Sequence, residues 1–142
     1  MNVKSLKQLT CAQKFVLITS FLTLTLGLGN LIRAVEAARY ANLLPNLPMA
    51  VPWAYLITLG GFWGLVFLAC TGGLALFRRW GRLLTLAAVT LYQAHVWINH
   101  LLFESNDYAR QTSLRDALLT LLLLAWTWVG LNWKSVRKTF KQ

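Results

Sequence analysis

The stretch "YQAHVWINHLLFE", residues 92–104, places polar and ionisable side chains inside a run that otherwise has the composition of a membrane-spanning helix. Each residue of an α-helix advances by about 100°, so His100 and Glu104, four positions apart, point the same way. A carboxylate beside an imidazole orients the ring and raises its proton affinity, as general acid–base catalysis or a proton relay requires. His100 and Glu104 are therefore the candidate catalytic residues, although this pair alone does not define an active site.

The helical spacing divides the polar residues of this stretch between two faces. One face carries Tyr92, His95 and Asn99, and the adjacent face carries Gln93, Trp97, His100 and Glu104. Because Asn and His side chains in membrane helices commonly hydrogen-bond to neighbouring helices, we expect the first face to serve helix packing. The second face becomes more polar towards one end, and we expect it to line a ligand-binding pocket there.

The histidines do not form a metal or haem site by their spacing. His95 and His100 lie about 140° apart around one helix, so they cannot readily hold one metal from a single face. A haem held by two histidines takes them from facing helices, and the sequence has only two histidines, both in this stretch. We therefore expect no metal and no haem cofactor.

A second polar stripe runs along the first apolar segment. It contains Thr19, Thr23 and Asn30 and leads into Arg33 and Glu36. An arginine near the end of a membrane span can reach the interface or pair with an acid such as Glu36. We expect Arg33 and Glu36 to meet His100 and Glu104 in one pocket in the outer half of the protein, with Arg33 binding an anionic group.

The composition places these stripes in a membrane protein. Hydrophobic residues make up 57% of the chain and charged residues 13%, whereas about a quarter of the residues of a soluble domain are charged. Long uncharged runs predict four membrane-spanning helices in one domain covering residues 1–142, an all-α four-helix bundle. The predicted spans are about 15–35, 53–77, 83–103 and 117–133.

The positions of the basic residues predict the orientation. Both ends of the chain and the turn between the second and third spans carry ten basic residues: Lys4, Lys7, Lys14, Arg78, Arg79, Arg82, Lys134, Arg137, Lys138 and Lys141. Cytoplasmic segments are enriched in Lys and Arg, so both termini are predicted to be cytoplasmic, in a bacterial or archaeal inner membrane. The proline-rich segment 40–52 is then an outer cap between the first two helices.

The net charge of +10 is explained by the basic residues that set this topology. It also favours contact with anionic lipids. We find no soluble basic face with stacking aromatic residues, so nucleic acid is not an expected partner. The two cysteines, Cys11 and Cys70, form no CxxC motif, and no disulfide is expected.

Small residues in the second span indicate close helix packing. Gly60 and Gly64 have the small-xxx-small spacing that lets two helix backbones approach. An internal helix contact is the preferred interpretation, and a homodimer interface is the alternative. Tryptophans placed deep in the predicted spans either fill the core or line an aromatic pocket for an apolar ligand.

Two functions are compatible with these patterns. The first is a non-catalytic membrane protein, either an accessory or scaffold subunit of a larger membrane complex or a protein that binds lipid or another apolar ligand. Short loops and an incomplete catalytic constellation favour it. The alternative is a small membrane enzyme or transporter, in which His100 and Glu104 transfer protons and Arg33 binds an anionic substrate group.

Overall fold

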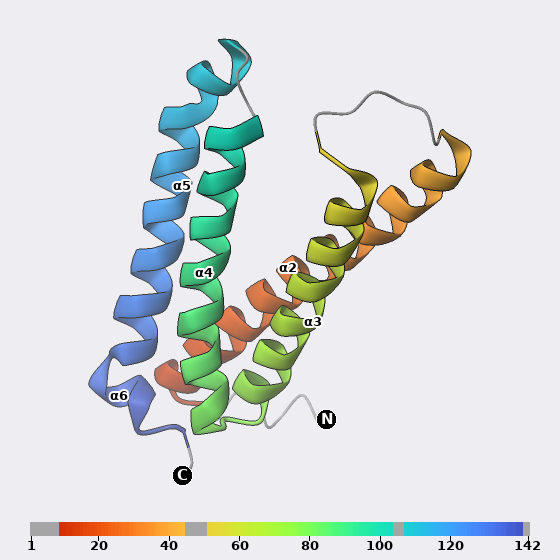
Figure 1. Ribbon diagram of the computed structural model, residues 1–142. Helices are drawn as coiled ribbons and strands as arrows, with labels where there is room; N and C mark the ends of the chain where they lie inside the picture. Colours follow the sequence, from red (N-terminus) through yellow and green to blue (C-terminus); the bar gives the residue numbers. More distant parts are fainter. Residues whose placement is uncertain (1–8, 45–50, 104–106, 141–142) are drawn as a thin grey trace.

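A computed structural model describes residues 9–44, 51–103 and 107–140, with side chains omitted for residues 103–112. The described residues are all-helical, with no strand among them. Figure 1 shows the helices, which are α2 (Cys11–Leu43), α3 (Trp53–Ala75), α4 (Arg79–Phe103), α5 (Asp107–Asn132) and α6 (Lys134–Arg137).

Three helices within the described residues are long and apolar enough to cross a membrane, and they indicate a membrane protein. They are α2, α3 and residues 113–132 of α5. The fourth predicted span, 83–103, lies in α4, which has 25 residues but is not among these three. The polar residues at positions 92–100 of α4 lower the mean hydropathy of this helix. A four-span bundle therefore stays a prediction.

The helix α2 is longer than the predicted span of 15–35. It begins with a capping box, in which the Gln13 backbone N–H donates to the Thr10 hydroxyl over 3.3 Å and the Thr10 N–H donates to the Gln13 side chain over 3.0 Å. The helix has 33 residues, or about 50 Å at 1.5 Å per residue. It continues through Arg33 to Leu43 because no proline interrupts it before Pro45.

The start of α5 also differs from the prediction. The helix begins at Asp107, ten residues before the predicted span. It is followed by the short helix α6, which the sequence pattern did not predict. Within the predicted outer cap, Pro52 directly precedes α3, whereas Pro45 and Pro48 lie outside the described residues.

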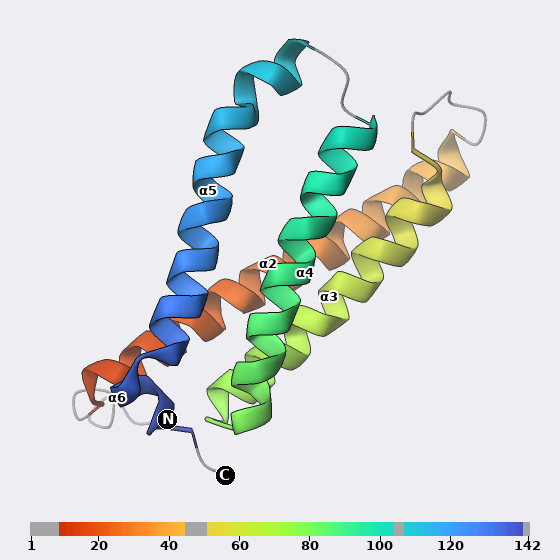
Figure 2. The ribbon, with the colours of Figure 1, turned by 60° about the vertical axis from the view of Figure 1, so that its left-hand side comes forward.

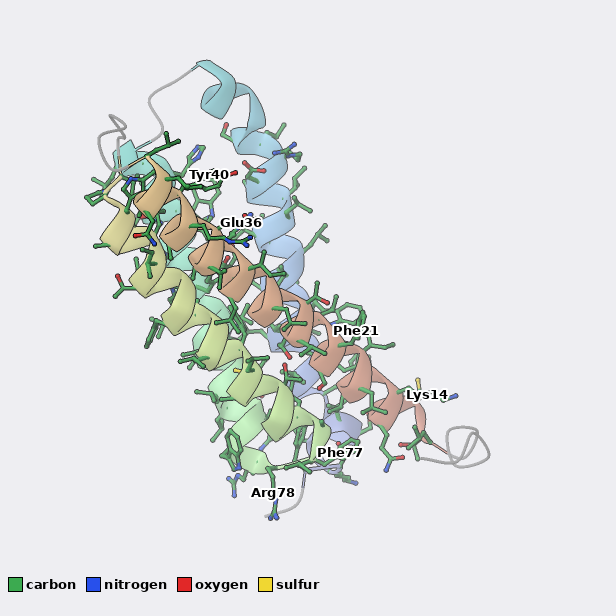
Figure 3. All side chains as sticks on the ribbon, turned by 90° about the vertical axis from the view of Figure 1, so that its right-hand side faces the viewer. Lys14, Phe21, Glu36, Tyr40, Phe77 and Arg78 are labelled. Carbon is green, nitrogen blue, oxygen red and sulfur yellow. The ribbon has the colours of Figure 1, made fainter. Side chains whose placement is uncertain are left out.

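The helices form two pairs that are inclined to each other (Figures 1 and 2). The antiparallel pair α2 and α3 crosses the pair α4 and α5 at an angle. Figure 3 labels Tyr40 and Glu36 at one end of the molecule and Lys14, Phe77 and Arg78 at the other. We call these the Tyr40 end and the Arg78 end.

Glycines allow the close crossings within the bundle. A Cβ atom added to Gly64 would lie 2.5 Å from the Cγ of Leu31, and one added to Gly60 would lie 3.0 Å from the carbonyl oxygen of Asn30. Both glycines therefore face α2. At the Arg78 end, a Cβ on Gly73 would lie 2.5 Å from the Cα of Gly81, which brings α3 and α4 into backbone contact.

A Schellman motif ends α3 and turns the chain into α4. The N–H of Arg78 donates to the Gly73 carbonyl and the N–H of Phe77 to the Leu74 carbonyl, each over 2.9 Å. Phe77 has a left-handed φ of 51° at the position that glycine usually occupies. Its side chain packs against the apolar cluster that joins the helices at this end, formed by Val16, Leu74, Leu86, Leu131, Val136 and Phe140.

Tryptophan hydrogen bonds attach α5 to the other helices. The Trp126 indole donates to the Thr19 hydroxyl of α2 over 3.2 Å, and the Trp128 indole donates to the Thr90 hydroxyl of α4 over 3.0 Å. Elsewhere α5 is apolar and open, since Leu121 and Leu122 are 63% and 66% exposed. Such a surface is suited to lipid or to another protein in the membrane.

Candidate functional site

A cavity of about 380 Å³ lies between α2, α3 and α4 at the Tyr40 end, and we call it the Arg33 cavity. It is lined by Asn30, Arg33, Glu36, Ala37 and Tyr40 of α2, by Trp53, Tyr55, Leu56, Leu59, Gly60 and Trp63 of α3, and by Tyr92, His95, Val96 and Asn99 of α4. Charged, polar and aromatic groups thus meet in one space.

Arg33 and Glu36 contribute the charge of this cavity. They stand one turn apart on α2, and both are exposed, so they form its rim. The sequence allows Arg33 either to reach the interface or to pair with Glu36, and no ion pair joins these two described side chains. The Tyr40 ring stacks on Trp53 beside this rim, with ring centroids 6.4 Å apart.

Hydrogen bonds between helices form the polar wall of the Arg33 cavity. The Tyr55 hydroxyl donates to the Asn99 side-chain oxygen over 2.6 Å, and the Asn30 amide donates to the Tyr92 hydroxyl over 3.4 Å. The Asn99 amide nitrogen lies 3.0 Å from Nε2 of His95. The first face of α4 therefore links α4 to both α2 and α3, and it also faces the cavity.

Aromatic rings form the remaining wall. Trp63 is 7% exposed. Its ring packs edge-on against Tyr92, with centroids 5.3 Å apart, and lies tilted to the His95 ring at 5.9 Å. The indole N–H groups of Trp53 and Trp63 are buried without a hydrogen-bond partner among the described residues. Buried polar groups normally have partners, and these two donors are exceptions among the described residues.

The second face of α4 lines a different cavity, of about 270 Å³, which we call the His100 cavity. Gln93, Trp97 and His100 meet Asp116 and Thr120 of α5 there. The Thr120 hydroxyl donates to Gln93 Oε1 over 3.1 Å and accepts from the Trp97 indole over 3.1 Å. This network binds α4 to α5.

The structure therefore divides the single pocket that the sequence predicts. Arg33 and Glu36 face Tyr92, His95 and Asn99, whereas His100 lies in the neighbouring cavity. The reason is the position of α4, which has α2 and α3 on one side and α5 on the other. Glu104, the predicted partner of His100, lies outside the described residues.

Several residues of the two cavities are missing from the sequence-based prediction. Trp53, Tyr55, Asp116 and Thr120 are not assigned to any site. Trp53, Gly60 and Trp63 repeat at helical spacing, which could have revealed one shared face of α3. No comparable pattern links Thr120 to Gln93, because their contact joins different helices.

In the described part of the chain, no three His, Cys, Asp or Glu side chains lie close enough to share a metal ion. The Arg33 cavity combines polar side chains, aromatic walls and a charged rim. Fold and site together define a helical membrane protein with a mixed polar and aromatic cavity. No protein-family model, curated protein or solved structure matches this chain.

Proposed function

We propose that this protein is a non-catalytic membrane protein that binds an amphipathic, lipid-like ligand in the Arg33 cavity. The observation that carries the proposal is that the Arg33 guanidinium and the aromatic residues Trp53, Trp63 and Tyr92 line one cavity. The proposed ligand has an apolar body and an anionic head with oxygen acceptors.

Each part of the cavity fits one part of such a ligand. The planar guanidinium of Arg33 matches a carboxylate or phosphate, and the aromatic rings provide apolar contact. The volume of about 380 Å³ falls within the range of about 300–1,000 Å³ typical of small-molecule sites.

The proposed topology has four membrane spans, with both termini in the cytoplasm of a bacterial or archaeal cell. In support, the polar groups of α4 are paired inside the protein: Tyr92 bonds to α2, Asn99 to α3 and Gln93 to α5. Such bonds reduce the cost of placing polar side chains in lipid. In this orientation the Tyr40 end, with the Arg33 cavity, is the outer end.

A role as an accessory subunit is compatible with ligand binding. The exposed apolar faces of α5 offer a surface for a larger membrane complex or for a second copy of the chain, with lipid covering the remainder. Under this proposal the bound ligand stabilises the Tyr40 end, while α5 contacts the larger complex or the second copy of the chain.

Quenching of tryptophan fluorescence by a fatty acid brominated on its chain tests ligand binding by the purified protein in neutral detergent. We expect saturable quenching, weakened about tenfold by Arg33→Gln because a charge-assisted hydrogen bond is lost. Arg39→Gln is the matched control, since Arg39 is exposed on α2 outside the cavity.

Quenching that does not saturate, or that responds equally to Arg33→Gln and Arg39→Gln, would contradict the proposal. Both variants remove one positive charge from the same end of α2. A specific site distinguishes between them, whereas nonspecific partitioning into the detergent micelle does not.

One observation favours the second candidate, a small enzyme or transporter. His100, Gln93 and Asp116 share the His100 cavity, which places an imidazole and a carboxylate next to the Arg33 cavity, where an anionic substrate group would bind. This candidate requires that His100→Gln abolish proton movement into liposomes that contain the protein. The leading proposal expects His100→Gln to leave fatty-acid binding unchanged.

A further inference from the structure

A basic pocket of about 420 Å³ opens at the Arg78 end, away from both cavities described above. Its lining residues are Arg79, Arg82, Lys134, Arg137, Lys138 and Phe140. Two come from the start of α4 and the others from α6 and the residues after it, so segments more than fifty positions apart converge (Figure 2). None of the lining residues is acidic.

The pocket has a fixed interior and is not only a solvated run of charges. Arg82 is 8% exposed, and its Nη1 donates to the side-chain oxygen of Asn132 over 2.9 Å, which orients the guanidinium. Val136 and Phe140 are buried in the apolar cluster at this end. They hold the basic residues beside them, Arg137 and Lys138, in place.

Among the described residues, no acidic side chain lies beside the positive charges of this pocket. Burial, and then the charges of Arg137 and Arg79, lower the pKa of the Arg82 guanidinium, although an arginine stays protonated at physiological pH. The described acidic side chains, Glu36 and Asp116, line the other two cavities. A bound anion would relieve the repulsion among the five cations.

We propose that this basic pocket binds a phosphate group that carries more than one negative charge. Arginine forks bind phosphate oxygens through paired N–H donors, and lysines add point charges. The group can belong to the phosphomonoester head of an anionic lipid or to a soluble phosphorylated molecule, because the recognition chemistry is the same. The proposal does not depend on a ligand in the Arg33 cavity.

Two probes separate the two sources. Native mass spectrometry of the full chain, exchanged into nanodiscs of phosphatidylcholine with a small fraction of phosphatidate, measures retained phosphatidate. Calorimetry with inorganic pyrophosphate in neutral detergent measures the soluble arm. Binding in either arm supports the proposal, and the arm in which it occurs identifies the source.

The test variant is the double substitution Arg137→Gln with Lys138→Gln, because both side chains are exposed and their loss leaves the Arg82–Asn132 bond in place. The matched control is Lys14→Gln with Arg78→Gln, which removes two charges from the same end but outside the pocket (Figure 3). We expect binding to fall by about tenfold or more in the test variant and by less than about twofold in the control.

Two results would overturn the proposal. Equal losses in the two double variants would show that net charge, and not the pocket, attracts the anion. Absence of binding by the wild-type protein in both arms would exclude the site. Circular dichroism of each variant confirms that the compared proteins are folded.

Discussion

The Tyr55 hydroxyl donates to the Asn99 side-chain oxygen over 2.6 Å and joins α3 to α4 in the wall of the Arg33 cavity. Because Asn99 also contacts His95 at 3.0 Å, one amide side chain connects the helix contact with the cavity surface. Helix packing and ligand binding therefore share residues at the Tyr40 end. A residue that looks like a packing contact in the sequence can also shape the binding site.

Removing this hydrogen bond should destabilise the protein. We expect Tyr55→Phe to lower the free energy of unfolding by about 0.6–1.7 kcal/mol, the range for hydrogen bonds between membrane helices. Thermal unfolding in detergent measures the change. Tyr40→Phe is the control, because the Tyr40 hydroxyl makes no hydrogen bond among the described residues. Equal effects of the two substitutions would contradict this role of the Tyr55 hydroxyl.

The neighbouring glycines Gly72 and Gly73 should respond oppositely to alanine. A Cβ on Gly73 meets the Cα of Gly81 at 2.5 Å, whereas one on Gly72 meets nothing within 4 Å. Gly73→Ala should cost about 1–3 kcal/mol through overpacking. Gly72→Ala should gain about 0.5–1 kcal/mol from helix propensity. Chemical unfolding of both variants checks the contrast, and a stable Gly73→Ala variant would refute the close α3–α4 crossing.

The left-handed backbone at Phe77 allows a comparison of two truncations. Both Phe77→Ala and Phe77→Gly lose the packing of the aromatic ring against the cluster at the Arg78 end. Glycine adopts the φ of 51° without the cost of about 1–2 kcal/mol that other residues bear there. Phe77→Gly should therefore be the more stable of the two in thermal unfolding. The reverse order would argue against this turn geometry.

The Thr120 hydroxyl should be necessary for the attachment of α5 to α4, since it bonds to both Gln93 and Trp97. Thr120→Val removes both bonds and leaves the buried Gln93 oxygen unpaired, at a cost of about 1–3 kcal/mol. Thr120→Ser should restore most of this stability because it keeps the hydroxyl. Thr25→Val serves as the control, as Thr25 is exposed and bonds only to the carbonyl of Phe21 within its own helix.

The Gly60 and Gly64 spacing shows how local patterns limit what can be predicted. The pattern predicts that two helix backbones approach closely. Cβ atoms added at both positions would indeed contact α2. It does not state which helix is approached, because any helix with small residues satisfies it. The same limit applies to α4. Helical periodicity predicts its two polar faces, but it does not predict which helices pack against each face.

The amino-acid sequence by itself determined the membrane character and most of the helix positions. Long uncharged runs indicate helices that lie in lipid and not in water. Because Pro52 marks where α3 can begin, the predicted span of 53–77 lies close to the observed Trp53–Ala75. Only the tertiary structure decided that Arg33 faces His95 and not His100. That choice depends on how α4 is rotated about its axis, which is set by the Gly73–Gly81 contact and the turn at Phe77. Such contacts join different helices, and no periodicity within one helix encodes them.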